Sequence, residues 1–414
     1  MEPQIGTINS HYVQKARLKN FSWQKGKHNK IIVADLGNKK IGSRNIESAF
    51  YQKGLYTNDV EVEMNDLIEK PGMRVFDKIY SSQHAAILTR NDLEILKKYL
   101  LVQLYRNPTN MSHYSPNWEG DILGLNKKYE TDAKAYQHIS NEIHTICSTS
   151  WKDLLKTKDK ELSNNIHIMR QTCTMFVRSQ SLEFVINDLG SVCERHPWSN
   201  LDENLVKKYF KDSTGIDFSD EIIQKLISTH QYYDNFTFYP ISSHFGIITI
   251  SPIWSILLKY KHPYRISYIG PNSPLRVDVD YSFYDWIAQT MGLYSEFIKQ
   301  LFIPCANVYE SPELQKAYCS DVSMEKFEAI VEEYSSPNDK YLFPVIDLNL
   351  EWAEYLNRLT INEAKEYFAF ESQLNGEISI ANYEMERVMY CQPGEAKHDL
   401  GWIDPTADWR EPLS

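Results

Sequence analysis

The sequence lacks most of the short motifs that identify enzyme classes. It has no glycine-rich phosphate loop ending in Gly-Lys-Ser/Thr, no Gly-x-Gly-x-x-Gly, no Gly-x-Ser-x-Gly and no His-Glu-x-x-His. These absences argue against a P-loop ATPase, a Rossmann enzyme, a hydrolase with a nucleophile elbow and a zincin metalloprotease.

Targeting signals, membrane spans and paired cysteines are absent as well. The opening segment lacks the charged, apolar and small-residue layout of a signal peptide, and no stretch supplies about 18 uninterrupted apolar residues. The six cysteines are scattered and form no Cys-x-x-Cys pair, so neither a disulfide framework nor a zinc knuckle is indicated. We expect a cytoplasmic protein that is not embedded in a membrane.

The histidines give no metal signature. His138, His144 and Cys147 form the densest local set. Residues six apart lie on opposite faces of a helix, so only His144 and Cys147 could share one ion. Ordinary helix histidines are the favoured interpretation, and we predict no metal site; the sequence leaves any cofactor unassigned.

Composition and charge indicate a folded chain whose two ends carry net charges of opposite sign. Of the 414 residues, 42% are hydrophobic and 24% are charged, which is ordinary for a globular protein. Residues 1–60 hold ten Lys/Arg and four Asp/Glu, a balance of +6, whereas residues 321–414 hold seven and twenty, a balance of −13. A basic head and an acidic tail can bind different partners or each other, and two solvated surfaces are the alternative.

Local patterns predict strands interleaved with helices. Residues 29–36 and 39–42 flank a Gly-Asn pair and predict a hairpin, in which the pair supplies the positive φ angles. Thr89 and Asp92 form a capping signature for a helix that ends before Pro108. A second hairpin is predicted from 173–178 and 182–187, and a strand region from 236 to 250. Further helices are predicted around 131–147, 201–210 and 283–302.

The predicted fold class is α+β, with mixed helices, β-hairpins and a mostly antiparallel sheet. We expect a domain over residues 1–320 and an acidic, largely helical appendage over 321–414, with helices at Met324–Tyr334 and Trp352–Phe370. An apolar face on the second of these helices predicts that the appendage docks on the body and covers part of its basic head.

A nucleic-acid surface is one interpretation of the basic head. Its candidate residues combine positive charge with an aromatic ring: Lys15, Arg17, Lys19, Trp23, Lys25 and Lys27. A solvated hairpin gives the same count of charges and is the alternative. The apolar residues of the same segment predict that 11–23 packs on the body.

The opening His11-Tyr12-Val13, followed by Leu18, Asn20 and Phe21, resembles the start of a bacterial family of unknown function, domain-of-unknown-function family 4238, whose members begin His-Tyr-Val-Pro. Other elements follow in the family's order: the first hairpin, Leu55-Tyr56-Thr57, a helix ending Gln103-x-x-Arg106-x-Pro108, a strand ending at Asp188, and Tyr239-Pro240-Ile241-Ser242. The resemblance covers about residues 9–310, and the acidic tail lies outside it. Gln14 replaces the usual proline, and Asn187-Asp188-Leu189-Gly190 replaces the family's Ser-Asp-x-Pro.

The resemblance implies three site residues, His11, Arg106 and Asp188. A histidine can move protons near neutral pH, an arginine can hold a phosphate, and an aspartate can orient the histidine. A structural set is equally coherent, with Asp188 paired to Arg106 and His11 fixing the N-terminal segment. In either case we expect the Asp188 side chain to face Arg106.

Two functions follow from these observations. The first is an effector enzyme that acts on a phosphate-bearing substrate, nuclease-like or nucleotide-hydrolysing, in a toxin or anti-phage setting. The alternative is a non-enzymatic binding or sensor protein whose acidic tail regulates the basic face. The partners expected are a nucleic acid or nucleotide and a protein that binds the acidic tail; the oligomeric state stays open.

Overall fold

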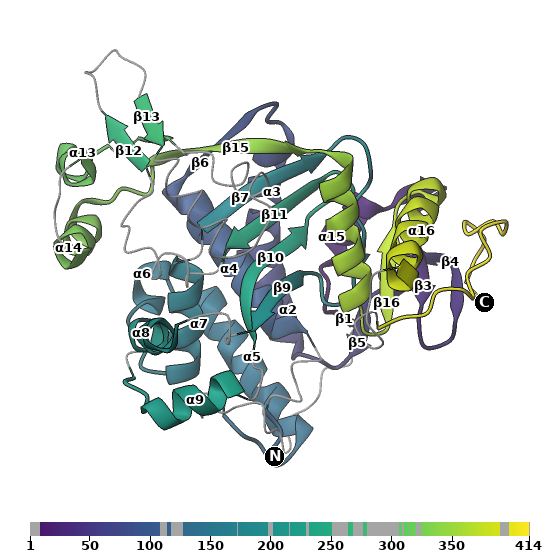
Figure 1. Cartoon of the computed structure of the whole chain (residues 1–414), viewed down its shortest axis with the longest axis horizontal. Helices are drawn as coiled ribbons and strands as arrows, with labels where there is room; N and C mark the ends of the chain where they lie inside the picture. The colour runs from purple at the N-terminus through teal and green to yellow at the C-terminus, as the bar shows by residue number, and fades with distance from the viewer. Residues whose placement is uncertain are drawn as a thin grey trace.

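The computed structural model describes residues 9–107, 114–116, 127–171, 173–197, 202–214, 216–228, 232–250, 264–267, 276–279, 306–308, 310–319, 324–389 and 397–413. The helix expected around 283–302 lies outside these residues. Two sheets organise the described chain, with helices packed around them (Figure 1). The fold is α+β, as predicted.

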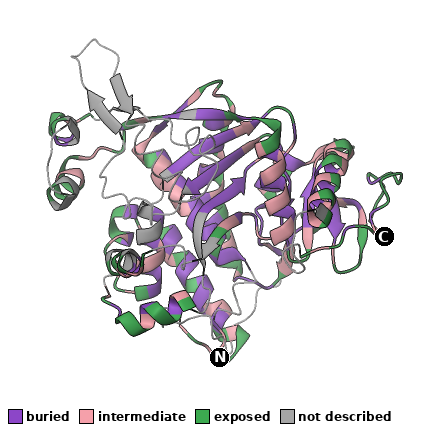
Figure 2. Cartoon of the chain, viewed as in Figure 1, coloured by how far each residue is buried: buried purple, intermediate pink, exposed green. Residues whose placement is uncertain are grey.

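The larger sheet is antiparallel except for one pair of strands. Its strands, in spatial order, are β14 (Ala306–Val308), β15 (Lys340–Leu348), β7 (Cys173–Ser179), β11 (Phe245–Ile250), β10 (Tyr232–Pro240) and β9 (Val192–Pro197), and β6 (Ala85–Thr89) also pairs with β15. β15 runs parallel to β7, with Val345 opposite Phe176. The buried apolar strands form the core of the molecule (Figure 2).

The smaller sheet joins the N-terminal head to the C-terminal region. Its strands are β2 (Trp23–Lys25), β3 (His28–Asp35), β16 (Tyr367–Phe370), β8 (Ile186–Asn187) and β4 (Lys40–Asn45). Two further strand pairs are β1 (Asn9–His11) with β5 (Tyr51–Lys53), and β12 (Tyr264–Ser267) with β13 (Arg276–Val279). β3 and β4 form the predicted hairpin, although Lys39, rather than Gly37 or Asn38, has the positive φ.

The helices cover both sheets. In the N-terminal half they are α1 (Lys15–Leu18), η1 (Lys19–Phe21), η2 (Ile46–Ser48), α2 (Asn58–Glu63), η3 (Met64–Glu69), α3 (Lys70–Tyr80), α4 (Arg90–Arg106), α5 (Asp132–Ser148), α6 (Trp151–Leu154) and α7 (Lys160–Gln171). Later in the chain they are α8 (Glu203–Thr214), α9 (Asp220–Ser228), α13 (Pro312–Cys319), α14 (Met324–Tyr334), α15 (Leu350–Glu363) and α16 (Gln373–Met389).

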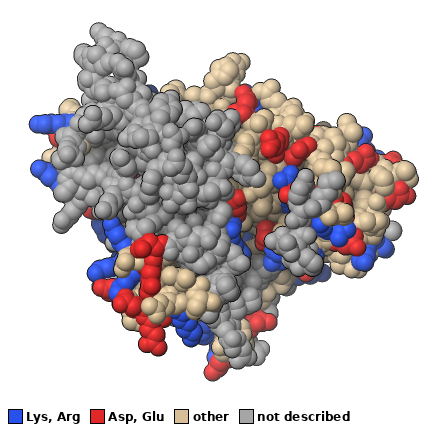
Figure 3. All heavy atoms as spheres, viewed as in Figure 1, with Lys and Arg blue, Asp and Glu red and all other residues tan. Residues whose placement is uncertain are grey.

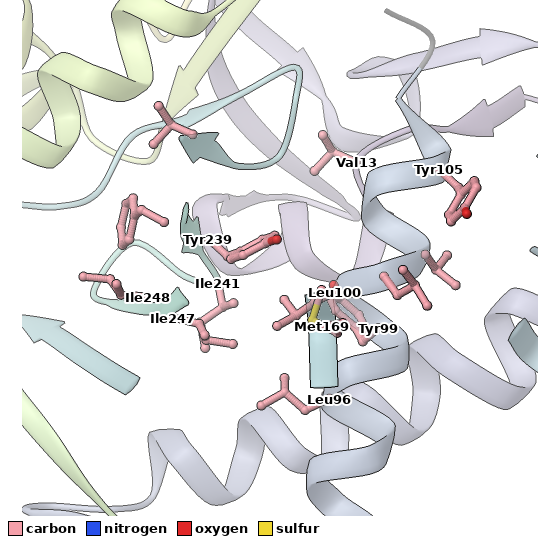
Figure 4. Packing of buried hydrophobic residues seen from close by; sticks show 14 of the residues in the cluster. Val13, Leu96, Tyr99, Leu100, Tyr105, Met169, Tyr239, Ile241, Ile247 and Ile248 are labelled. Carbon is pink, nitrogen blue, oxygen red and sulfur yellow. The ribbon is translucent and has the colours of Figure 1, made fainter. Parts of the chain in front are cut away.

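Helix α4 is the central helix of the core. The Thr89 hydroxyl accepts from the Asp92 N–H, and the Asp92 carboxylate accepts from the Thr89 N–H, which is the predicted capping box. Leu96 and Leu100 of α4 pack toward the apolar residues of β10 and β11 (Figure 4). The prediction that residues 11–23 pack on the body is confirmed, because Val13, Leu18 and Phe21 are completely buried.

The second predicted hairpin is wrong. β7 pairs with β11 and β15, not with residues 182–187. The main chain after β7 finds other partners: the Phe184 N–H donates to the Ser243 carbonyl, and the Val185 N–H to the Asn357 side chain. The apolar run is real, but it is buried between segments distant in sequence.

Strands from both sides of the predicted domain boundary share the two sheets. β15 and β16 lie beyond residue 320, and they pair with β7 and β3. The predicted docking of the tail is therefore confirmed, but it occurs by strand pairing as well as by the apolar face of α15. The helix predicted over Trp352–Phe370 is too long, since α15 ends at Glu363 and β16 follows.

Candidate functional site

Asp188 binds the main chain of the C-terminal region. Its carboxylate accepts from the N–H groups of Lys365 at 2.9 Å, Glu366 at 2.6 Å and Tyr367 at 3.3 Å. Burial raises the pKa of Asp188 to about 6, although these three donors oppose the shift. The Asp188 N–H also donates to the Tyr367 carbonyl. Asp188 therefore anchors the start of β16.

Arg106 pairs with glutamates rather than with Asp188. Its Nη1 lies 2.5 Å from Glu69 Oε1, and its Nη2 lies 3.8 Å from Glu61 Oε1. Glu69 ends η3, a π-helical turn directly before Lys70-Pro71, and proline lacks the N–H that continues a helix. The predicted pairing of Asp188 with Arg106 is wrong because Glu69, on an adjacent helical turn, takes the guanidinium.

His11 lies within the electrostatic reach of this pair. Its Nε2 is 3.3 Å from the Ile46 carbonyl, and its ring packs near Tyr51. Burial lowers the pKa of His11, and the charges of Arg106 and Lys15 lower it further, whereas Glu69 opposes them. The charge of Arg106 thus reaches His11, although no hydrogen bond joins the two described side chains, and Asp188 instead binds the main chain before β16.

We predict that Asp188→Ala destabilises the protein without abolishing the chemistry proposed below. Three main-chain donors would lose their acceptor, and each unsatisfied buried donor costs about 1–3 kcal/mol. Urea unfolding monitored by circular dichroism measures the loss. Asp188→Asn, which keeps one acceptor oxygen, is the matched control and should lose less; equal stability of all three proteins would refute the anchoring role.

Of the predicted nucleic-acid residues, Arg17 is in the wrong place. It is completely buried, and its Nε donates to the Pro240 carbonyl at 2.7 Å while Nη2 donates to Gly190. Burial lowers its pKa. A side chain held in this way ties the N-terminal segment to the body and cannot contact a nucleic acid. The segment packs inward because its apolar residues Val13, Leu18 and Phe21 are buried in the core.

The other basic candidates lie at the surface. Lys19, Lys25 and Lys27 are exposed, and Lys15 is paired with Glu47 at 3.4 Å. Trp23 is half-buried beneath the guanidinium of Arg410, 5.7 Å from its ring centroid. On the face shown in Figure 3, the described acidic and basic side chains are interspersed rather than gathered by sign.

A cluster that sequence reasoning missed surrounds His138 on α5. His138 Nδ1 lies 3.7 Å from Glu142 Oε1, one turn along the helix, and Nε2 lies 3.4 Å from Glu161 Oε2 on α7. Tyr129 stacks on the imidazole with 5.1 Å between centroids, and Tyr114 meets it edge-on at 5.4 Å. The Tyr114 hydroxyl donates to Glu161 Oε1 at 2.8 Å. A buried imidazole therefore lies between two carboxyl groups.

The two glutamates of the cluster have pKa values shifted in opposite directions. Burial raises the pKa of Glu142 to about 7, His138 opposes this, and the negative charge of Asp159 adds to it. Burial would raise the pKa of Glu161 too, but the nearby His138 imidazole and the hydrogen bond from Tyr114 hold it below its usual range. Two carboxyl groups whose pKa values are shifted in opposite directions are typical of an acid–base site.

One side of the cluster reaches the surface. Lys127, whose side chain is 41% exposed, is paired with Asp159 and lies 3.9 Å from Glu142 Oε1. Glu142 Oε2 is buried and has no hydrogen-bond partner within the described part of the chain. Glu142 therefore has one carboxyl oxygen without a partner in the cluster, and Lys127, which is paired with Asp159, lies beside the other oxygen.

The sequence contained part of this signal. His138 and Glu142 are four residues apart, which places both on one face of a helix. His138 and His144, the histidine pair that the sequence offers as candidate ligands, are six residues apart and lie on opposite faces. His144 instead pairs with Glu63 at 2.6 Å, on the exposed side of α5. In the ranges that the structure describes, no group of three or more His, Cys, Asp or Glu is arranged to hold a metal ion, and no helix there is long and apolar enough to cross a membrane.

Comparison with known proteins places the chain in a family. No curated protein and no solved structure matches it. A family model, "Protein of unknown function (DUF4238)", matches residues 9–373. This match extends past α15 and β16, so the expectation that the resemblance stops before the acidic tail is wrong. The chain therefore belongs to the DUF4238 family.

Proposed function

We propose that this chain is an enzyme that hydrolyses a phosphate-bearing substrate, nuclease-like or nucleotide-hydrolysing, with its acid–base site at His138, Glu142 and Glu161. The observation that carries the proposal is the buried carboxyl of Glu142, which has a pKa of about 7 and an unpartnered oxygen, beside a histidine that has Glu161 on its other side. A proton donor with a pKa close to the working pH is efficient because it is available in both protonation states.

Each residue has a distinct role in the proposed reaction. Glu161, kept ionised 3.4 Å from His138 Nε2, stabilises the imidazole when it is protonated. As water forms its bond to phosphorus and the bond to the leaving oxygen breaks, protonated Glu142 gives its proton to that oxygen. The proton released by the attacking water passes through His138 and returns to Glu142, so the site is regenerated. Lys127, which also pairs with Asp159, offsets part of the charge of the phosphoryl oxygens.

The substrate class is supported by positive charge in two places. Lys127 lies at the exposed edge of the cluster, and Lys19, Lys25 and Lys27 are exposed on the N-terminal head. Phosphate groups are bound by such cations with a strong dependence on salt. We also propose a toxin or anti-phage effector role. Expression of the wild type should then arrest cell growth, and expression of Glu142→Gln should not.

The experiment is a hydrolysis screen on the purified full chain. Single- and double-stranded DNA, RNA and the ribonucleoside triphosphates are each incubated with the protein, with and without divalent cations, and products are separated by gel or chromatography. We expect turnover of at least one of these substrates by the wild type and its loss in Glu142→Gln. Activity that Glu142→Gln retains would place the chemistry elsewhere, and inactivity on every substrate would overturn the phosphate assignment.

The binding or sensor alternative has one observation in its favour. The C-terminal segment packs on the basic head: Arg410 covers the Trp23 ring, and the Leu413 N–H donates to the Ser43 carbonyl at 3.0 Å. If this segment restricts a nucleic-acid surface, Arg410→Ala should strengthen salt-sensitive binding of single-stranded DNA in a fluorescence anisotropy assay. Unchanged binding would leave the segment with a packing role only.

A further inference from the structure

Helix α16 has two apolar faces, of which only one is covered. Ile380 and Tyr383 face the smaller sheet and are buried with Phe370 of β16. Gly376 allows this close packing, because a Cβ there would lie 2.2 Å from the Phe370 ring. The outer side of α16, at the edge of the molecule near the C-terminus (Figure 1), carries a second set of apolar side chains.

The outer side chains form a continuous stripe. The stripe consists of five exposed residues at successive spacings of four, three, four and three: Leu374, Ile378, Ala381, Met385 and Val388. Val388 is 75% exposed, Leu374 66% and Met385 54%. Scattered surface apolar residues are normal, but a stripe over the length of a helix indicates a missing partner. The spacing averages 3.5 residues, which is the repeat of a coiled coil.

The flanking residues favour a second copy of this chain in parallel orientation. In the heptad that the stripe defines, Glu377 and Glu384 occupy one flank, and Asn375 and Asn382 occupy the other. In a parallel pair Glu377 meets Asn382 of the second copy, a side chain that donates to Glu354 of its own chain, so the flanking glutamates of the two α16 helices do not face each other. In an antiparallel pair the glutamate flanks meet, which is unfavourable.

We propose that α16 is a dimerisation helix, which pairs with α16 of a second copy in parallel through the stripe from Leu374 to Val388. The contact is isologous, so each residue of the stripe meets its own counterpart across a two-fold axis. Two heptads bury less surface than a standard interface, so we expect a dissociation constant of about 1–100 μM. Because each chain carries a net charge of −11, added salt should strengthen the dimer.

Sedimentation velocity and a cysteine cross-link test this proposal on the full chain. We expect a concentration-dependent dimer for the wild type and a more than tenfold weaker dimer for Met385→Glu. Because Met385 is exposed, this substitution should leave the melting temperature unchanged. Ala381→Cys should form an intermolecular disulfide on mild oxidation, since residues at this position meet their counterparts at a distance that a disulfide spans. Gln24→Cys, exposed on the N-terminal head, is the matched control and should not cross-link above the wild-type background.

Three outcomes would overturn the proposal. They are a wild-type monomer at several hundred micromolar, a dimer that Met385→Glu leaves intact, and an Ala381→Cys protein that cross-links no more than Gln24→Cys. The first would leave the stripe without a second copy, and the other two would move the dimer interface away from α16 or reverse its orientation.

Discussion

Arg106→Met is expected to lower the free energy of unfolding by about 3–5 kcal/mol, since removing one partner of a buried ion pair leaves the other charge without compensation. The Arg106 side chain is 1% exposed, and its partner Glu69 is 12% exposed. The Tyr56 hydroxyl donates to the main-chain carbonyl of Arg106 at 2.6 Å, a bond that methionine keeps, so the substitution removes the ion pair and leaves this contact in place. Urea unfolding at pH 7 measures the change.

Two further variants separate the buried charge from the arginine itself. Arg178→Met is the matched control, because Arg178 pairs with Asp347 at 2.6 Å but that carboxylate is 46% exposed; we expect a loss of at most about 1 kcal/mol. The double variant Arg106→Met with Glu69→Met should recover part of the stability lost in Arg106→Met. If Arg106→Met were as stable as Arg178→Met, the pair with Glu69 would not hold η3 to α4.

Substitutions in the His138 cluster are expected to have the largest effect on activity. Glu142→Gln and His138→Asn each replace a proton-transfer group with an amide of similar size. General acid–base catalysis contributes about 10²–10⁴-fold to the rate. We expect losses of that size in kcat, with the circular dichroism spectrum and the melting temperature close to those of the wild type. The readout is turnover on the substrate found in the hydrolysis screen.

The same helix supplies the control for these substitutions. His144 and Glu63 form an exposed histidine–glutamate pair on α5 and α2, so His144→Asn changes the same residue type without reaching the cluster. Its activity should equal that of the wild type. A comparable loss in His144→Asn and His138→Asn would show that the effect comes from α5 as a whole rather than from the cluster.

Local features of the fold could be predicted from the sequence, because their causes lie within a few residues. The capping box at Thr89 and Asp92 starts α4, and the alternation around Gly37-Asn38 gives the β3–β4 hairpin. The apolar content of residues 11–23 predicted their burial. In each case the interacting groups are close in sequence, so spacing alone carries the information.

The long-range pairings could not be predicted in this way. β15 pairs with β7 from more than 160 residues away, and Asp188 finds its donors at Lys365, Glu366 and Tyr367. An aspartate at a strand end can pair with an arginine or with main-chain N–H groups, and only the topology decides between them. The apolar run after β7 therefore predicts a hairpin strand, whereas its hydrogen bonds go to distant segments.

The candidate site was visible only in part for the same reason. His138 and Glu142 share a helix face by their spacing, but Glu161 comes from α7 and Tyr114 from a separate segment. The shift in the pKa of Glu142 arises from burial, which a single sequence does not reveal. Of the residues that the resemblance implies, Arg106 is near enough for its charge to lower the pKa of His11, but Glu69 takes the position expected for Asp188.

The pH dependence of kcat/KM between pH 5.5 and 8.5 tests most directly whether Glu142 is the proton donor. Since its pKa is raised to about 7, the protonated form dominates below that pH and is lost above it. We predict that kcat/KM falls with an apparent pKa of about 7 as the pH rises, and that the residual activity of Glu142→Gln lacks this limb. A profile that rises through pH 7, or a falling limb that Glu142→Gln retains unchanged, would contradict the account.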